Sequence, residues 1–180
     1  MNKKNDWNPY KSKWKAALEK NLIPKLKENE AILYLGASSG TTINHLSKQT
    51  SETIFAVEKS TTMAIPLVKL AQKSSNIAPI FADANNTQYI KTQLHKTTPN
   101  ILFQDIPSSD QIEILTKASK LVSTKCKIYL SLKTKSISQQ SQSKTLEQAT
   151  IKLQKSFMIE NHASLEPFHK KHHFFILRRK

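Results

Sequence analysis

Short apolar runs alternate with amphipathic segments along most of the chain. The apolar runs predict β-strands at Ile32–Leu35, Thr53–Val57, Ala78–Phe81, Ile101–Gln104 and Ile128–Leu132. The segments between them predict helices at Thr41–Lys48, Thr61–Gln72, Thr87–His95 and Ser109–Leu121. This alternation implies βα units, and therefore an α/β protein with a mostly parallel sheet that helices cover on both faces.

The two ends of the chain add further elements. Pro9–Asn21 predicts a helix that Pro9 opens in its first turn and that packs beside the ligand edge of the sheet. Ser136–Ser143 is rich in Ser and Gln and predicts a surface loop. After it, Leu146, Ala149 and Leu153 lie on one side of a further helix. Two last apolar runs, Phe157–Leu165 and His173–Leu177, predict an antiparallel hairpin.

Length and composition narrow the class of protein. A chain of 180 residues fits a single domain, with residues 1–28 as a helical extension packed on it. No apolar run reaches the roughly 18 residues of a membrane span, and the first residues lack a secretory signal. Cys126 is the single cysteine, so no disulfide framework exists. We expect an intracellular, soluble protein without membrane partners.

The only two glycines, Gly36 and Gly40, lie where the first predicted strand ends, in LYLGASSGTT. Glycine permits positive φ and a close approach of the backbone to a neighbour. Ligands of doubly wound sheets bind beyond the carboxyl ends of the strands. We therefore predict that this turn passes close to a ligand and that N–H groups at the start of the next helix face its carboxylate or phosphate.

Acidic residues end three further predicted strands: Glu58 in IFAVE, Asp83 in IFADA and Asp105 in ILFQD. Glu58 can accept hydrogen bonds from both hydroxyls of a ribose, and Asp83 can accept one from an adenine amino group. The alternative for Glu58 is an ordinary surface carboxylate. The glycine turn is short for the pyrophosphate of a nicotinamide cofactor, so S-adenosylmethionine is the better fit. Five parallel strands with a terminal hairpin likewise match a seven-stranded, Rossmann-like class I methyltransferase sheet better than a dinucleotide-binding one.

The chain is strongly basic. It carries 28 Lys and Arg against 13 Asp and Glu, a formal net charge of +15. This charge favours polyanionic partners, chiefly RNA or DNA. A compositional bias towards Lys, Asn and Ile, with little Gly, is the alternative explanation.

Several motifs occur in one order between residues 7 and 177: WNPYKSKWKAAL, LYLGASSGTT, AVEKS, FQDIPSSDQIEIL, LKTKSI and LEPFHKKHHFF. With them the chain resembles the fibrillarin family, and its archaeal form in particular. The resemblance implies an enzyme that methylates ribose 2′-hydroxyls of rRNA and tRNA from S-adenosyl-L-methionine. It also implies a C/D-box guide RNA, a Nop-type scaffold protein and a kink-turn-binding, ribosomal-protein-like subunit as partners. The implied location is cytoplasmic in archaea and nucleolar in eukaryotes.

The resemblance also implies the cofactor contacts. Gly36 lies in the turn, and Thr41 and Thr42 contact the methionine part of the cofactor. Glu58 and Lys59 contact the ribose, and Asp83 and Ala84 contact the adenine. The segment at 105–108 closes the methyl-donor side with Asp105, Ile106, Pro107 and Ser108.

By the same resemblance the reaction centre consists of Lys13, Asp105, Lys133 and His172. A 2′-hydroxyl is a poor nucleophile while protonated, and a lysine whose pKa is lowered by burial near other cations can accept its proton. Lys133 is the candidate for that amine. Asp105 would orient it and offset the sulfonium charge, Lys13 would position phosphate or ribose, and His172 would orient Lys133 or the hydroxyl. The alternative for each lysine is a solvated surface charge.

Four histidines cluster in the last part of the chain, but the sequence predicts no metal site, because one cysteine and no carboxylate pattern accompany them. Trp7 and Trp14 have two interpretations, stacking on RNA bases or packing of the N-terminal helix.

Four features depart from the family pattern. Lys59 stands where an aromatic residue is usual, Ser108 where a Gln is usual, and Thr124-Lys125-Cys126 where a Gly-Gly pair is usual. Archaeal relatives also carry a small N-terminal β domain, whereas this chain begins almost at the catalytic domain. Lys59 and Ser108 motivate one alternative, a catalytically weakened, RNA-binding structural subunit of the same particle. A second alternative, which the resemblance implies, is a protein-glutamine methyltransferase.

Overall fold

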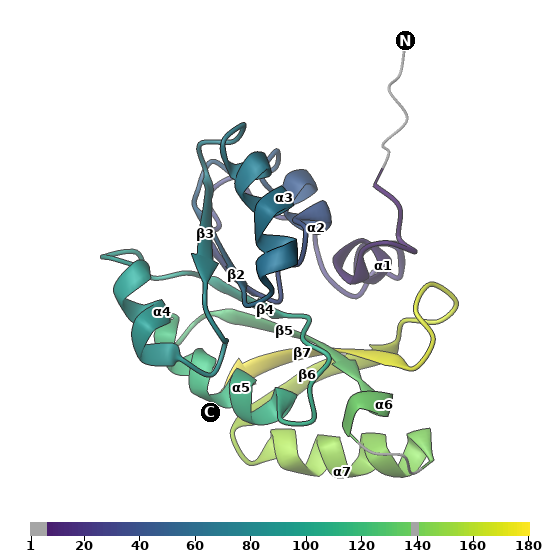
Figure 1. Ribbon diagram of the computed structural model, residues 1–180. Coiled ribbons are helices and arrows are strands. Elements are labelled where there is room, and N and C mark those ends of the chain that lie inside the picture. The colour runs from purple at the N-terminus through teal and green to yellow at the C-terminus, as the bar shows by residue number, and fades with distance from the viewer. Residues whose placement is uncertain (1–6, 138–140) are drawn as a thin grey trace.

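Seven strands form one sheet in the order β3-β2-β1-β4-β5-β7-β6 in the computed structural model, which describes residues 7–137 and 141–180 (Figure 1). The strands are β1 (Ile32–Leu35), β2 (Ile54–Glu58), β3 (Ile77–Phe81), β4 (Ile101–Gln104), β5 (Lys127–Lys133), β6 (Phe157–Ser164) and β7 (His172–Arg179). The first five are parallel, and β7 pairs antiparallel with both β5 and β6. The predicted α/β class, the parallel sheet and the terminal hairpin are therefore confirmed.

Helices cover the sheet in two layers (Figure 1). One layer holds α1 (Lys13–Glu19), α2 (Thr41–Leu46) and α3 (Thr61–Ala71), and the other holds α4 (Thr87–Gln93), α5 (Gln111–Ala118) and α7 (Gln142–Gln154). Short helices at Thr134–Ile137 (α6) and Ser119–Leu121 (η1) complete the fold. Alternate strand residues supply the two cores: Leu33 and Leu35 pack towards α4, α5 and α7, whereas Ile32 and Tyr34 pack towards α1, α2 and α3.

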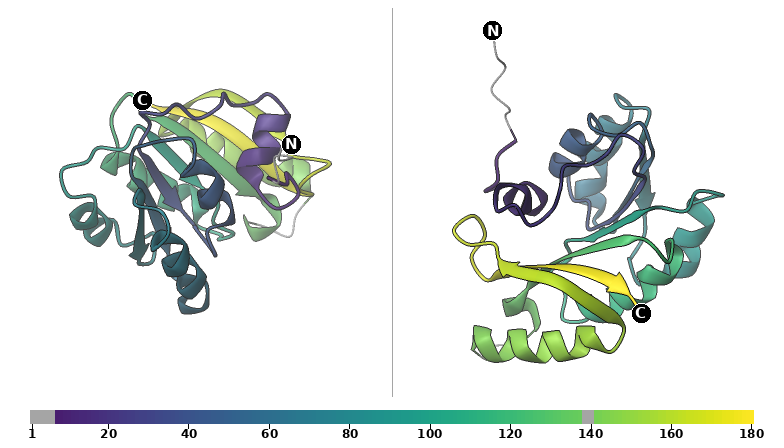
Figure 2. Two further views of the ribbon diagram at one scale, coloured as in Figure 1. Left: turned by 90° about the horizontal axis from the view of Figure 1, so that it is seen from above. Right: turned by 180° about the vertical axis from the view of Figure 1, so that it is seen from behind.

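Trp14 anchors α1 on the sheet. Its side chain is 1% exposed, and its ring meets Phe103 of β4 and Tyr129 of β5 edge-on, at centroid distances of 5.2 and 5.5 Å. The tip of the β6–β7 hairpin lies beside the same N-terminal segment (Figure 2). There, His169 Nε2 lies 2.8 Å from the carbonyl oxygen of Pro9. The N-terminal segment therefore lies at the carboxyl edge of the parallel strands, as predicted.

Serine caps correct two predicted boundaries. The first helix starts at Lys13 rather than in the turn at Pro9, because the Ser12 side chain accepts a hydrogen bond from the Lys15 N–H at 3.2 Å. The predicted loop Ser136–Ser143 is also partly wrong. Its first two residues belong to α6, and Ser141 caps α7 so that the helix begins at Gln142; residues 138–140 lie outside the described part.

The remaining elements agree with the predicted ranges to within two residues at each end, with 119–121 as a 3-10 turn. None of the helices in the described part of the chain is long and apolar enough to cross a membrane.

Candidate active site

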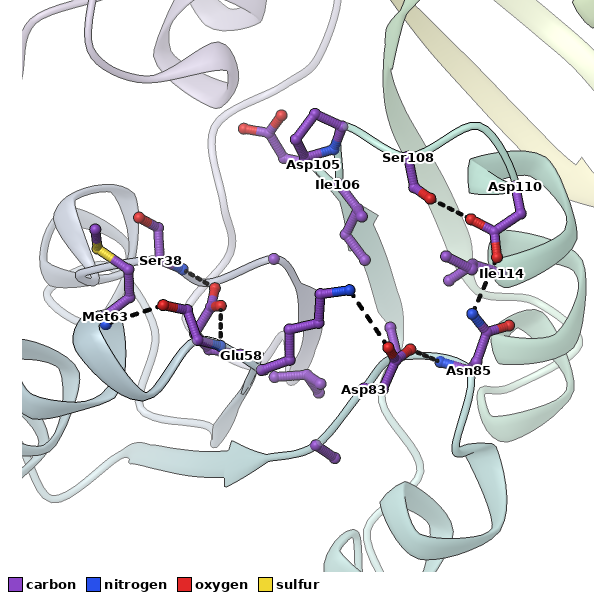
Figure 3. A pocket seen from close by; sticks show the side chains of 17 residues that line it. Ser38, Glu58, Met63, Asp83, Asn85, Asp105, Ile106, Ser108, Asp110 and Ile114 are labelled. Atoms are coloured by element: carbon purple, nitrogen blue, oxygen red, sulfur yellow. Dashed lines mark hydrogen bonds and ion pairs between the residues drawn. The ribbon is translucent and has the colours of Figure 1, made fainter. Parts of the chain in front are cut away.

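A cavity of about 440 Å³ lies beyond the carboxyl ends of β1, β2, β3 and β4 (Figure 3). The structure brings most of the predicted cofactor-binding residues to its wall, namely Gly36, Glu58, Lys59, Asp83, Ala84, Asp105, Ile106, Pro107 and Ser108. The three acidic residues that end successive strands therefore surround one space. Its size falls within the roughly 300–1,000 Å³ of small-molecule sites.

Glu58 is held rigidly at the end of β2. One of its carboxylate oxygens accepts the Ser38 N–H at 2.7 Å, and the other accepts the Ser60 N–H at 2.8 Å (Figure 3). Each oxygen keeps further acceptor capacity, because a carboxylate has about four lone-pair sites. Glu58 can therefore accept two more hydroxyl donors without reorienting.

Asp83 occupies the neighbouring position beyond β3. Its carboxylate accepts the Asn85 N–H at 2.9 Å and lies 3.4 Å from the Lys59 ammonium. The Asn85 N–H lowers the pKa of Asp83, and the nearby Lys59 charge lowers it further. Asp83 is thus an ionised acceptor at neutral pH, and Lys59 spans the gap between the ends of β2 and β3.

The opposite wall is held by a small polar network. The Ser108 hydroxyl donates to Asp110, and the Asn85 side-chain amide donates to the other oxygen of Asp110 at 3.1 Å. These two hydrogen bonds lower the pKa of Asp110. Ser108 therefore directs its hydroxyl to Asp110 rather than into open space.

Several lining residues were not predicted from the sequence, namely Ser38, Ser60, Met63, Asn85, Asp110 and Ile114. For two of them, the sequence does contain a signal that indicates their position. Ser60 and Asp110 stand just before helices that follow strands, where polar residues favour a helix start and face the ligand edge. Ser38 and Asn85 lie in turns whose path only the fold defines.

Thr41 and Thr42 do not line this cavity. Thr41 is exposed, whereas Thr42 is buried and donates its hydroxyl to Ser12 Oγ at 2.9 Å. Thr42 thereby joins α2 to the start of α1. The Gly40 N–H donates to the Ala37 carbonyl oxygen at 3.1 Å, so this amide does not face a ligand.

Both glycines have the predicted positive φ, +84° at Gly36 and +83° at Gly40. A Cβ on Gly36 would overlap the Asp105 carbonyl oxygen, and one on Gly40 would lie 2.7 Å from Leu70 Cδ2. The close neighbours that require glycine are thus parts of the protein itself. Gly36 lets the β1 turn pass directly against the end of β4.

Side-chain alternation places three of the four predicted reaction-centre residues on one face of the sheet. Asp105 follows Phe103 by two residues, Lys133 follows Tyr129 by four, and His172 precedes Phe174 by two. Phe174 contacts the rings of Phe103 and Tyr129, and both of these rings also contact Trp14 of α1. The three polar side chains therefore project on the α1 side of the carboxyl edge.

One ion pair and one strand pairing join members of this group. Lys13, the first residue of α1, places its ammonium 3.0 Å from the Asp105 carboxylate. Lys133 is the register partner of His172 across the β5–β7 ladder. The structure thus gathers Lys13, Asp105, Lys133 and His172 at one corner, next to the cavity wall that Asp105 forms.

His172 has a defined protonation pattern. Its Nδ1 lies 3.0 Å from the Lys170 carbonyl oxygen, and since a carbonyl only accepts, Nδ1 carries the hydrogen. Burial lowers the pKa of His172 below its ordinary 6.5, and the Lys13 charge lowers it further, although the Lys170 carbonyl opposes this. The ring is neutral at pH 7, so Nε2 is an acceptor at the α1 corner.

Neither tryptophan is placed to stack on a nucleic-acid base. Trp14 is buried between α1, to which it belongs, and the sheet. Trp7 is buried with its ring stacked on His45 at a centroid distance of 5.0 Å. Packing is therefore the correct interpretation of the two. Within 7–137 and 141–180, no group of three or more His, Cys, Asp or Glu side chains is arranged to hold a metal ion.

Comparison with known proteins gives the family. The fibrillarin family model matches residues 3–180. The chain belongs to the fibrillarin family. It is 33% identical over 172 residues to the fibrillarin-like rRNA/tRNA 2′-O-methyltransferase of Archaeoglobus fulgidus, a match that covers 94% of this chain and 81% of that protein.

Solved fibrillarin structures share the fold. A fibrillarin/Nop5p complex contains a chain that superposes with a TM-score of 0.89 at 30% identity, covering 97% of this chain and 84% of that one. Aeropyrum pernix fibrillarin with natively bound S-adenosyl-L-methionine superposes with a TM-score of 0.82 at 26% identity, covering 95% and 76%. The class I methyltransferase sheet predicted from the sequence is thus the fold of this chain.

Proposed function

We propose that this member of the fibrillarin family transfers a methyl group from S-adenosyl-L-methionine to ribose 2′-hydroxyls of rRNA and tRNA. The observation that carries the proposal is the position of the Lys13–Asp105 ion pair: Asp105 belongs both to the cavity wall and to the basic corner on the α1 side. A ligand in the cavity and a sugar at the corner would share this one carboxylate. Family membership supports the same reaction.

The residues present fit this cofactor. Glu58 is a hydrogen-bond acceptor with both oxygens pre-oriented, which suits the two hydroxyls of a ribose. Asp83 suits an adenine amino group, with Ala84 beside it. Ile106 and Pro107 form an apolar part of the cavity wall next to Asp105. When bound, S-adenosylmethionine supplies an electrophilic methyl group on a sulfonium.

The corner residues then act on the ribose. Lys133 is the proposed acceptor of the 2′-hydroxyl proton, and Asp105 holds that amine and balances positive charge. His172, neutral and with Nε2 unprotonated, accepts a hydrogen bond that orients Lys133 or the hydroxyl. Lys13, fixed by Asp105, positions the sugar or its phosphate. Orientation of hydroxyl and methyl donor in one line supplies much of the rate.

The proposed partners follow from the family. A solved relative is a fibrillarin/Nop5p complex, which supports a Nop-type scaffold for this chain. A C/D-box guide RNA would choose the target by base pairing, and a kink-turn-binding subunit would anchor that guide. Such an assembly fits a chain with a formal net charge of +15.

Lys133→Ala tests the reaction. We expect methyl transfer to a guide-matched RNA to fall by about 10²–10⁴-fold, because the proton acceptor is lost, with S-adenosylmethionine affinity nearly unchanged. Incorporation of labelled methyl into RNA measures the first, and isothermal titration the second. Lys155→Ala, which removes an exposed lysine at the end of α7, is the charge-matched control. Wild-type turnover in Lys133→Ala would refute the assigned role, and label in protein instead of RNA would refute the substrate.

Two contacts favour a second candidate, a subunit that binds RNA without catalysis. Lys59 lies within ion-pair distance of Asp83, and Ser108 donates to Asp110, so both polar groups already have protein partners. The two functions differ in one measurement. No S-adenosylmethionine binding, either by the chain alone or in the assembled particle, would favour the structural subunit.

A further inference from the structure

Gln111 joins the two strands that carry Asp105 and Lys133. It is the first residue of α5, its side chain is 0% exposed, and it lies between the β4 end and the β5 end. The side-chain amide nitrogen donates to the Lys133 carbonyl oxygen at 3.2 Å and to the Ser108 carbonyl oxygen at 2.8 Å. The side-chain oxygen accepts the Lys133 N–H, also at 3.2 Å.

These contacts begin where the sheet ladder stops. The last paired residue of β4, Gln104, lies opposite Leu130, three positions before Lys133. Beyond that point β4 gives way to the 105–110 segment, and the Lys133 peptide groups on this side have no strand partner among the described residues. Buried backbone groups need partners. The Gln111 amide supplies a donor and an acceptor, as another residue of β4 would.

A second buried glutamine completes the connection. Gln104, immediately before Asp105, donates its side-chain amide to the Gln111 carbonyl oxygen at 2.6 Å. Gln104 is also 0% exposed. A continuous set of hydrogen bonds thus runs from the residue before Asp105, through Gln111, to the backbone of Lys133.

We propose that Gln111 is a positioning residue that sets the distance between Lys133 and Asp105 through this amide bridge, and so aligns the proton acceptor with the methyl donor. The inference rests on the proposed function, in which Lys133 accepts the proton. Gln111 is fully buried and does not line the cavity, so it acts through the Lys133 backbone. Small errors of alignment in such a centre cost about 10²-fold in rate.

The variant Gln111→Met keeps side-chain length and burial but removes all three amide hydrogen bonds. We expect kcat for methyl transfer, counted per folded molecule, to fall about 10- to 100-fold. The KM for S-adenosylmethionine should change by less than about threefold. Glu58 and Asp83 are held by hydrogen bonds that do not involve Gln111, and Ser108 keeps its side-chain hydrogen bond to Asp110. A merely structural role would lower the folded fraction and leave kcat per folded molecule unaltered.

Leu153→Ala is the matched control, since it destabilises the core to which α5 also contributes, and Lys133 is not a member of that core. It should melt at a lower temperature and retain wild-type kcat per folded molecule. Wild-type kcat in folded Gln111→Met would overturn the inference while leaving the proposed function intact. Absence of methyl transfer by the wild-type particle would instead contradict the proposed function.

Hydrogen exchange of the wild-type protein tests the bridge without any variant. The Lys133 amide should be protected to the same degree as ladder amides within β5, because its hydrogen is bonded to the buried Gln111 oxygen. Exchange of the Lys133 amide at the rate of an open loop would overturn the inference, whether or not Gln111→Met folds.

Discussion

At the scale of single residues, glycine and histidine show how neighbours define a role. Gly36 is required because the β4 end passes against it, and Gly40 because Leu70 of α3 does. Three histidines near the β6–β7 hairpin, His169, His172 and His173, share a different feature. Partial burial lowers the pKa of each below the ordinary value of 6.5.

The histidines predict an acid-sensitive fold. Well above pH 6.5 they are largely neutral whether the chain is folded or not. As the pH falls below that value the unfolded chain takes up protons first, so the free energy of unfolding decreases until the folded pKa values are passed. We expect the melting temperature to fall between pH 7.5 and pH 5, above the range in which most carboxylates titrate. His173→Phe should flatten this dependence, and an unchanged slope would contradict the assignment.

At the scale of elements, α1 connects packing to chemistry. It is seven residues long and contributes no side chain to the cavity wall, yet it presents Lys13 to Asp105. The helix stays in place through Trp14 on the aromatic cluster and through the Thr42–Ser12 hydrogen bond. In the proposed function, cofactor binding and the positioning of the ribose by Lys13 therefore depend on different elements.

The variant Trp14→Ala should separate the effect on cofactor binding from the effect on methyl transfer. Loss of this buried ring should lower the free energy of unfolding by about 3–5 kcal/mol, measured by urea denaturation. In the molecules that remain folded, S-adenosylmethionine affinity should stay near wild type while methyl transfer falls, because Lys13 loses its fixed position. Equal transfer per folded molecule would show that α1 does not present a reactive group.

At the scale of the whole molecule, the hairpin tip brings further basic residues to the corner that holds Lys13, Asp105, Lys133 and His172. Lys170 and Lys171 are exposed, and the Lys171 carbonyl oxygen accepts hydrogen bonds from the N–H and the hydroxyl of Thr134, both at 3.1 Å. The exposed Lys135 follows directly. The turn after β5 and the hairpin tip therefore form one basic rim beside Lys133, where the proposed function needs a site for the RNA backbone.

The rim predicts a salt-dependent affinity for RNA. Replacing Lys170 and Lys171 by Ala should weaken binding of a target RNA regardless of its sequence. The slope of log K against log salt should become less steep by about one for each lysine that contacts a phosphate. Fluorescence anisotropy over a KCl series measures this. The double variant Lys69→Ala/Lys73→Ala, at the far end of α3, is the charge-matched control, and equal slopes in both variants would contradict a localised rim.

The periodic pattern of the sequence determined the elements and most of the cofactor wall. Strands buried on both faces read as continuous apolar runs, and the acidic residue after each run lies at the ligand edge because parallel strands end on the same side. The sequence alone therefore sufficed to predict that Glu58, Asp83 and Asp105 lie together. Serine caps at 12 and 141 escaped prediction, because capping depends on a single hydrogen bond.

Only the tertiary structure decided which side chains meet. Thr42 bonds α1 rather than lining the cavity, Trp14 packs rather than stacks on RNA, and Gln111 replaces a missing strand neighbour of Lys133. None of these roles has a local pattern, since each depends on contacts between segments distant in the chain. The physical reason is that periodicity reports which face of an element is buried, whereas hydrogen-bond partners depend on how the elements pack.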